Sequence, residues 1–176
     1  GVTIRLPWVD AMTVAVSSDS MINPRAPGAS LKSEFVAFKV NRIVEAASHL
    51  FYERGYSSCT LDNVANQLSV TKPFLYSYFR NKEAILAAIC EVGISEALAV
   101  LEDVLAHQHE SHRAKLAEVV RKVGRIVIDR QEYVVVYQRE MKHLSADDYK
   151  RILRLRHSFD HQIGTMIREG VASGEF

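Results

Sequence analysis

The chain has 176 residues, with 22 Lys and Arg against 21 Asp and Glu, and 48% of its residues are hydrophobic. This length and composition are typical of a foldable protein with one or two compact domains, and they exclude an intrinsically disordered chain. The formal net charge of +1 is uninformative as a total, because a nucleic-acid-binding protein can balance a basic face with acidic surface elsewhere.

Targeting signals and disulfides are not expected. No apolar run approaches the roughly 20 residues that a membrane-spanning helix needs. The short apolar patch near the start is interrupted by Asp10 and has few basic residues before it, so we do not expect a secretory signal. Cys59 and Cys90 give neither a disulfide framework nor the spacing of a zinc site. These features fit a cytoplasmic protein with no membrane partner.

Residues 1–32 contain three of the four prolines together with several Ser and Gly residues. Such a composition is typical of irregular chain, and we expect a flexible N-terminal arm there. Arg25, Lys32 and Lys39 are candidates for phosphate contacts made from this arm. An unbound tail is the alternative.

Four helices are predicted after the arm, because apolar residues recur there at spacings of three and four. Gly55 ends the first helix in the manner of a C-cap, and Thr60 caps the second. Ser69 and Val70 make a tight turn. The apolar positions of the first two helices are Val36, Val40, Ile43, Ala47, Leu50 and Phe51, then Leu61, Val64, Ala65 and Leu68.

The third helix is short and follows the turn directly. Thr71 is placed to cap it, and Pro73 lies in its first turn, where a missing N–H has no cost. Val70, Leu75 and Phe79 continue the apolar core. Asn81 caps a long fourth helix that runs to about His107. Two short helices joined by a tight turn have the layout of a helix-turn-helix, in which the second helix enters the major groove of DNA.

The rest of the chain is also predicted to be helical. One stripe consists of Leu116, Val119, Val120, Val123 and Val127. A second segment runs from Glu132 to His143; its EYVVVY run favours a strand in isolation, but it lacks hairpin partners, so we assign it to a helix. Ser145 starts a last helix with a pattern similar to a capping box, and Gly170 closes it.

Four segments in residues 41–91 carry a family resemblance: RIVEAA at 42–47, LFYERGY at 50–56, TLDNVA at 60–65 and LYSYFRNKEAIL at 75–86. They resemble the DNA-binding domain of the TetR family of transcriptional regulators. The resemblance implies an all-α fold, with a three-helix helix-turn-helix DNA-binding domain at 33–80. A helical effector-binding and dimerisation domain then occupies 81–176.

The resemblance and the helix geometry together indicate which residues are expected to contact DNA. Thr60, Tyr76 and Lys82 are expected to contact phosphate, with Lys82 adding charge at the N-terminus of the fourth helix. The residues expected to face bases or sugars are Thr71, Lys72, Phe74, Ser77 and Tyr78. Ordinary packing is the alternative for Phe74, Tyr76 and Tyr78, since aromatic residues on a helix are commonly buried.

Three positions depart from the family pattern. Ser69 stands where the family usually has glycine, so a left-handed backbone there would be strained by about 1 kcal/mol. Pro73 and Phe74 replace a small residue and a Thr-like residue. Phe74 cannot hydrogen-bond a base edge, but it can pack against a thymine methyl group. The operator sequence therefore cannot be copied from relatives.

The resemblance also implies partners: a palindromic double-stranded DNA operator bound by a homodimer, and a small-molecule effector that releases the repressor. Members of the family dimerise through their last two helices, and they normally continue beyond the point where this chain ends at GVASGEF. We therefore expect the C-terminal domain to be incomplete. The candidate effector-binding residues are Tyr133, Tyr137, Met141 and Phe159, for which core packing is the alternative.

Other binding chemistries have weaker support in the sequence. Basic residues gather on the last helix at Lys150, Arg151, Arg154, Arg156 and His157; a solvated face is the usual explanation, and capture of an anionic ligand is the alternative. His157 and His161 have the i, i+4 spacing of metal ligands, but no carboxylate or Cys completes a site. We expect no metal, no cofactor and no enzyme activity. A helical carrier or enzyme using the two histidines and a constitutive DNA-organising protein are the alternative functions.

Overall fold

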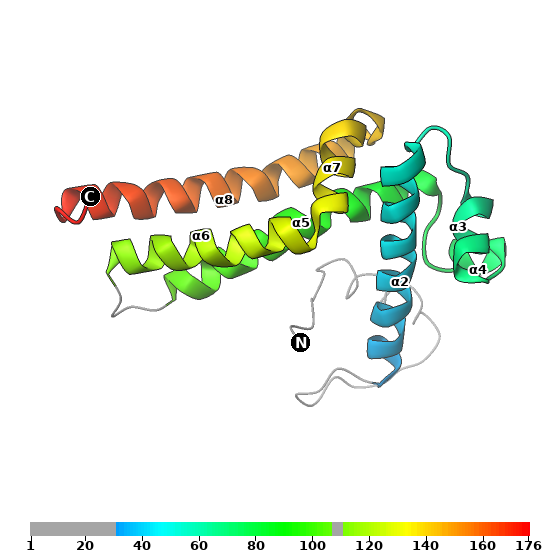
Figure 1. The fold of residues 1–176 in the computed structure, drawn as a ribbon, viewed down its shortest axis with the longest axis horizontal. Coiled ribbons are helices and arrows are strands. Elements are labelled where there is room, and N and C mark those ends of the chain that lie inside the picture. The colour runs from blue at the N-terminus through cyan, green and yellow to red at the C-terminus, as the bar shows by residue number, and fades with distance from the viewer. Residues whose placement is uncertain (1–30, 107–110) are drawn as a thin grey trace. The chain divides into compact units, whose positions relative to one another are not determined.

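The computed structural model describes residues 31–106 and 111–176, and every regular element in these residues is a helix (Figure 1). The all-α fold predicted from the sequence is therefore confirmed. The chain divides into two compact units, Gly1–Ile85 and Leu86–Phe176. The helices are α2 (Leu31–Arg54), α3 (Leu61–Leu68), α4 (Lys72–Tyr76), α5 (Lys82–Leu105), α6 (His112–Asp129), α7 (Gln131–Glu140), the 3₁₀ turn η1 (Met141–His143) and α8 (Ala146–Ala172).

The N-terminal arm lies outside the described residues as far as residue 30, together with its candidate phosphate contact Arg25. Helix α2 begins at Leu31, so the helix starts within the last two residues assigned to the arm. Lys39 is exposed on α2.

Helix α2 forms the base of the first unit. One face of it is completely buried, including Val40, Ile43 and Ala47, and it packs against α3. The helix ends as predicted, because Gly55 adopts a left-handed backbone with φ 78° and its N–H donates to the Phe51 carbonyl at 2.9 Å. This is the hydrogen bond of a glycine C-cap.

The turn between α3 and α4 depends on a strained serine. Helix α3 starts with a capping box: Thr60 Oγ1 accepts from the Asn63 N–H at 3.2 Å, and Asn63 Oδ1 accepts from the Thr60 N–H at 2.8 Å. At the other end Ser69 has φ 56° and ψ 40°, and the Val70 N–H donates to the Ala65 carbonyl at 3.0 Å. The left-handed backbone expected at Ser69 is therefore present.

Helix α4 is only five residues long, with Pro73 in its first turn. Leu75 and Phe79 are buried as predicted. Leu68 and Val70, which were also assigned to the core, are only half-buried. They lie at the end of α3 and in the turn that follows it.

Helix α5 begins in the first unit and continues into the second. The predicted cap is present, because Asn81 Oδ1 accepts from the Ala84 N–H at 2.8 Å. The expectation that no segment has the length and apolarity of a membrane span is wrong for this helix. However, 56% of its most apolar window is buried inside the protein, as in the core helix of a globular domain.

In the second unit, α6 packs against α8, and the two run side by side in Figure 1. A core cluster of Leu101, Val104 and Val119 is extended by the half-buried Val123 and Phe159, among others. The predicted EYVVVY helix is present as part of α7. Ser145 caps α8 as expected, since its Oγ accepts from the Asp148 N–H at 3.1 Å.

Two details of the second unit differ from the sequence predictions. Val120 and Val127 were assigned to the buried stripe of α6, but Val120 is 64% exposed and Val127 is also exposed. They lie about 80–100° around the helix from the buried Val119. Helix α8 runs two residues past Gly170, where the Phe176 ring packs close to the glycine.

Ser69→Gly is expected to increase the free energy of unfolding by roughly 0.5–1 kcal/mol, because glycine adopts positive φ without steric cost. Urea unfolding measures this change. Ser57→Gly is the matched control: Ser57 is an exposed turn residue, and Ser69 is the one non-glycine residue with positive φ among those described. The control should be neutral or destabilising, and a Ser69→Gly variant no more stable than wild type would contradict the strain.

Candidate nucleic-acid interface

Helix α4 has one face in the core and the opposite face in solvent. Leu75 is completely buried, whereas Tyr76 is 51% exposed and Thr71 is also exposed. Thr71 occupies the N-cap position, but its side chain makes no capping hydrogen bond. The predicted cap is therefore positional only, and Thr71 is exposed. Tyr76 and Thr71 have the accessibility that contact with a nucleic acid requires.

Lys72 is held by an ion pair across the turn. Its Nζ donates to Asp62 Oδ2 of α3 at 2.8 Å, and both side chains are exposed. The hydrogen bond to Asp62 raises the pKa of Lys72, so the ammonium remains charged over the physiological range. An exposed pair of this kind contributes little net stability. Exchange of Asp62 for a phosphate oxygen is therefore inexpensive.

Phe74 and Tyr78 pack on each other. Their ring centroids are 5.1 Å apart with an interplanar angle of 57°, and both residues are half-buried. Each of these aromatics is therefore packed against the other and also partly accessible to solvent, which is intermediate between core packing and a free contact residue.

Two of the predicted contact residues have hydrogen bonds that serve the fold. Ser77 is the C-cap residue of α4, and its hydroxyl donates to the Pro73 carbonyl at 3.2 Å. The Thr60 hydroxyl lies 2.9 Å from Asn63 Oδ1 and takes part in the capping box. Both residues are exposed, so a contact with DNA remains a prediction for each, but it must compete with these local bonds.

Lys82 has a structural role that the sequence did not predict. Its Nζ donates to the backbone carbonyls of Tyr56 and Cys59, each at 2.8 Å, and lies 4.1 Å from the centroid of the Tyr56 ring. The side chain was expected to be free to contact phosphate. Instead two of its three donors are used, because the loop after α2 presents carbonyl groups at the start of α5.

Sequence reasoning missed three partners in this region: Tyr56, Asp62 and Asn63. Only Asn63 had a readable signal, the capping-box spacing after Thr60. Asp62 is ten residues from Lys72, and Tyr56 is 26 residues from Lys82. Pairings over such separations are created by the fold, and local periodicity does not encode them.

The residues proposed from the sequence to bind an effector lie in the second unit. Tyr133 is buried beneath Arg130, whose guanidinium carbon is 5.4 Å from the ring centroid. Tyr137 and Met141 are half-buried. Phe159 packs against the Leu101–Val104–Val119 cluster, and no described contact joins it to the other three. Their role in binding remains a prediction.

The basic face of α8 is partly neutralised by acidic partners. Arg151 pairs with Glu91 and Asp148, both at 3.0 Å, and Arg156 pairs with Asp160 at 3.8 Å. His157 and His161 are both exposed. Within residues 31–106 and 111–176, no group of three or more His, Cys, Asp or Glu side chains is arranged to hold a metal ion.

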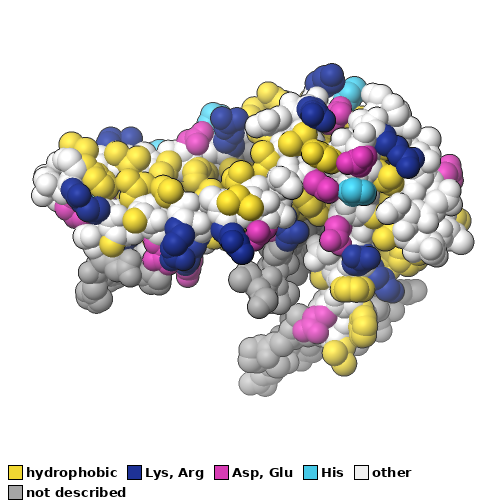
Figure 2. Space-filling view, in the orientation of Figure 1, with side chains coloured by type: hydrophobic (Ala, Val, Ile, Leu, Met, Phe, Trp, Pro, Cys, Tyr) yellow, Lys and Arg dark blue, Asp and Glu magenta, His cyan; other side chains and the backbone are white. Residues whose placement is uncertain are grey.

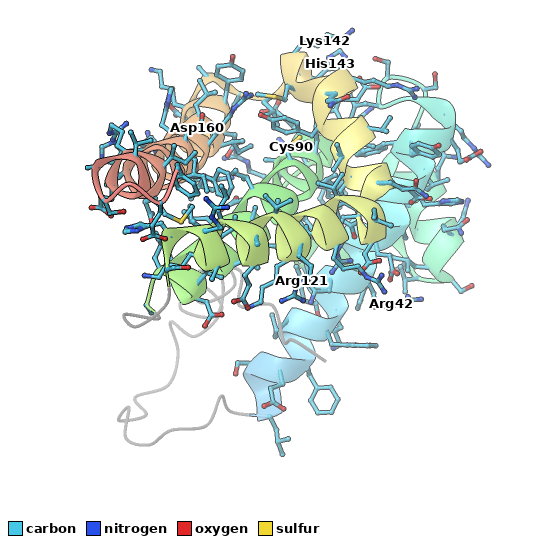
Figure 3. All side chains as sticks on the ribbon, turned by 60° about the vertical axis from the view of Figure 1, so that its left-hand side comes forward. Arg42, Cys90, Arg121, Lys142, His143 and Asp160 are labelled. Atoms are coloured by element: carbon cyan, nitrogen blue, oxygen red, sulfur yellow. The ribbon has the colours of Figure 1, made fainter. Side chains whose placement is uncertain are left out.

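The described side chains of both units are drawn in Figure 3, where Arg42 lies on α2 and Cys90 on α5, with Lys142 and His143 at the turn between α7 and α8.

Burial raises the pKa of the Cys90 thiol to about 12 and also raises that of Cys59. Both thiols are therefore protonated at neutral pH and are inert structural residues.

The comparisons with known proteins match both units. Residues 43–89 match the family described as "Bacterial regulatory proteins, tetR family", and residues 109–176 match "Tetracyclin repressor-like, C-terminal domain". A solved structure of a TetR family transcriptional regulator, PfmR from Thermus thermophilus, is 27% identical with a TM-score of 0.71, and the match covers 77% of this chain and 73% of that chain.

Two curated relatives extend the comparison. The Fatty acid metabolism regulator protein of Bacillus subtilis is 24% identical over 78% of this chain and 70% of its own length. The transcriptional repressor KstR2 of Rhodococcus jostii is 25% identical over 76% of this chain and 66% of its own length. The matched region thus spans about two thirds of these relatives.

A helix-turn-helix unit followed by a helical unit defines a DNA-binding transcriptional regulator, which is not an enzyme. The chain belongs to the TetR family of these regulators.

Lys82→Met is expected to lower the free energy of unfolding by about 2 kcal/mol, because two hydrogen bonds from a charged donor and a cation–π contact are lost. Chemical denaturation measures the change. Lys150→Met, at an exposed position on α8, is the control and should have an effect within about 0.5 kcal/mol. Equal stability of the two variants would show that Lys82 does not anchor α5.

Proposed function

We propose that this protein is a cytoplasmic, ligand-responsive transcriptional repressor that binds a palindromic operator as a homodimer and leaves it when a small-molecule effector binds. The observation that carries the proposal is the exposed face of α4, where Thr71, Lys72 and Tyr76 are presented on a helix fixed by the buried Leu75. A short rigid helix with polar, cationic and aromatic groups on its outer face suits the major groove.

Different side chains of the first unit make different kinds of contact with DNA in this proposal. Tyr76 and Lys72 supply phosphate or base-edge contacts, while the paired rings of Phe74 and Tyr78 offer an apolar edge to a thymine methyl. The third donor of Lys82 and the hydroxyls of Thr60, Thr71 and Ser77 add to the interface. Because one unit offers few phosphate contacts, useful affinity requires two copies on a two-fold site.

An exposed apolar surface in the second unit supports self-association. Val120, Val127 and Ile128 on α6 are exposed, as are Ile167 and Val171 on α8. Figure 2 shows hydrophobic side chains gathered over these two helices. Contiguous exposed apolar surface of this kind is typical of protein contact sites, and a second copy of the chain would cover it.

The relatives suggest a class of effector. The name of one relative refers to fatty acid metabolism, and that of a solved structure of similar fold to a ketosteroid regulator. Both names concern molecules with large apolar bodies. The apolar interior of the second unit suits such a molecule, so we propose that the effector is lipid-derived. Such a ligand releases the repressor only if it binds the DNA-incompetent state more tightly, with a coupling of about 1–3 kcal/mol.

Sequence-specific retardation of the gene's own upstream DNA in a gel-shift titration tests the proposal. Lys72→Ala should reduce the slope of log K against log salt concentration by about 2 in magnitude. Each copy in the dimer loses one phosphate contact, and each contact contributes about 0.9 to that slope. Tyr76→Phe should weaken binding about tenfold or more without unfolding the protein. Lys142→Ala, an exposed lysine of the second unit, is the control. Unchanged affinity in both α4 variants would remove α4 from the interface.

Ile128→Glu is expected to convert the dimer to a monomer, because a carboxylate placed in an apolar contact loses its hydration without gaining a partner. Light scattering coupled to size-exclusion chromatography measures the mass. Gln138→Glu introduces a carboxylate at an exposed position on α7 and should leave the mass unchanged. A dimer that survives Ile128→Glu would place the contact elsewhere.

A further inference from the structure

Three buried polar atoms of the second unit lack hydrogen bonds. They are Glu91 Oε2 and Ser95 Oγ on α5, and Arg151 Nε on α8; none of them has a hydrogen-bond partner among the described residues. Glu91 is 4% exposed. Buried polar groups in folded proteins are nearly always hydrogen-bonded, and each exception calls for an explanation. Three exceptions around one ion pair indicate a site that receives a polar group.

The geometry brings the three atoms to one place. Glu91 and Ser95 are four residues apart, so they lie on the same face of α5 one turn from each other. Arg151 reaches this face from α8, because one of its terminal nitrogens forms an ion pair with Glu91 Oε2 at 3.0 Å. Helices α5 and α8 thus hold a carboxylate, a hydroxyl and a guanidinium N–H at one junction.

Arg151 is fixed in this position from its other side. Its second terminal nitrogen lies 3.0 Å from Asp148 Oδ1, and Ser145 Oγ donates to Asp148 Oδ2 at 2.8 Å. The guanidinium is therefore held between two carboxylates at the start of α8. Its Nε–H has no hydrogen-bond partner among the described residues.

The charges at this junction select the kind of group that fits. Two carboxylates face one guanidinium, so the site has an excess of negative charge and disfavours an anion. Burial raises the pKa of Glu91, opposed by the nearby Arg151. The unused atoms are a carboxylate acceptor, a guanidinium donor and a hydroxyl that does both. A neutral group that donates and accepts at once, an amide or a hydroxyl, satisfies all three.

We propose that Glu91, Ser95 and Arg151 form the polar anchor of the effector site and bind the amide or hydroxyl group of a neutral molecule with an apolar body. Ala88, Val92 and Ile152, which are buried beside these residues on α5 and α8, supply apolar surface next to the anchor. The role of this ligand as an effector rests on the proposed function, whereas the existence of the binding site does not depend on that function.

Three probes of equal chain length test the anchor: dodecanamide, dodecan-1-ol and dodecanoate, titrated into the full chain at pH 7.5 by calorimetry. The amide and the alcohol are expected to bind at least tenfold more tightly than the carboxylate. Ser95→Ala should weaken amide and alcohol binding about fivefold. Glu91→Gln removes the negative charge and should reduce the preference over dodecanoate by tenfold or more, an effect that a merely structural role for Glu91 does not produce.

Ser95→Ala removes an unpartnered hydroxyl, so its Tm without probe should equal or exceed that of wild type, which separates lost binding from lost folding. Arg156→Gln, at an exposed ion pair on the same helix, is the control and should bind all probes as wild type does. Equal binding of the three probes, absence of binding, or wild-type selectivity in Glu91→Gln would each overturn the anchor. Gel shifts with the same variants decide the proposed function separately, since failure to bind DNA leaves the probe titrations valid.

Discussion

The contact between Lys82 and the loop after α2 is the interaction on which the arrangement of the first unit depends. Lys82 is the first residue of α5. Its ammonium group donates hydrogen bonds to two backbone carbonyls and makes a cation–π contact with the ring of Tyr56. Because the Tyr56 and Cys59 carbonyls lie in the loop, outside any helix, they are free to accept from the lysine, which ties the start of α5 to this loop. The position of α4, just before that start, follows from this anchor and from the burial of Leu75 and Phe79.

The polar side chains of the first unit are held in place before any ligand arrives. Lys72 is paired with Asp62, Ser77 is bonded to the Pro73 carbonyl, and Thr60 serves the capping box. These are exposed, local and individually weak contacts, so DNA can replace them at small cost. Preorganisation of this kind reduces the conformational entropy lost on binding. Ser69, in contrast, lowers the stability of the unit, because its backbone adopts a strained positive φ that glycine would adopt without strain.

The second unit combines an apolar core with a polar junction. The Leu101–Val104–Val119 cluster stabilises the packing of α6 and α8 through hydrophobic burial. At the start of α8, the buried carboxylates of Glu91 and Asp148 pair instead with Arg151, whose side chain is partly exposed. A partly buried ion network is rarely retained for stability alone, because desolvation offsets much of its Coulomb energy. Recognition of a polar group, as proposed above, accounts for the presence of this ion network.

The class of fold, the helix-turn-helix and most helix ends could be predicted from local sequence, because periodicity and the signals at Thr60, Ser69, Asn81 and Ser145 act over three or four residues. The same periodicity indicated which face of α4 is outward. The roles of the charged side chains depend instead on tertiary packing: Lys82 anchors the loop after α2, Lys72 pairs with Asp62, and the partly exposed Arg151 pairs with Glu91. Packing also left Val120 and Val127 exposed, since a helical stripe is buried only where a neighbouring helix covers it. Partners far apart in the sequence are brought together by the fold, and no local pattern records them.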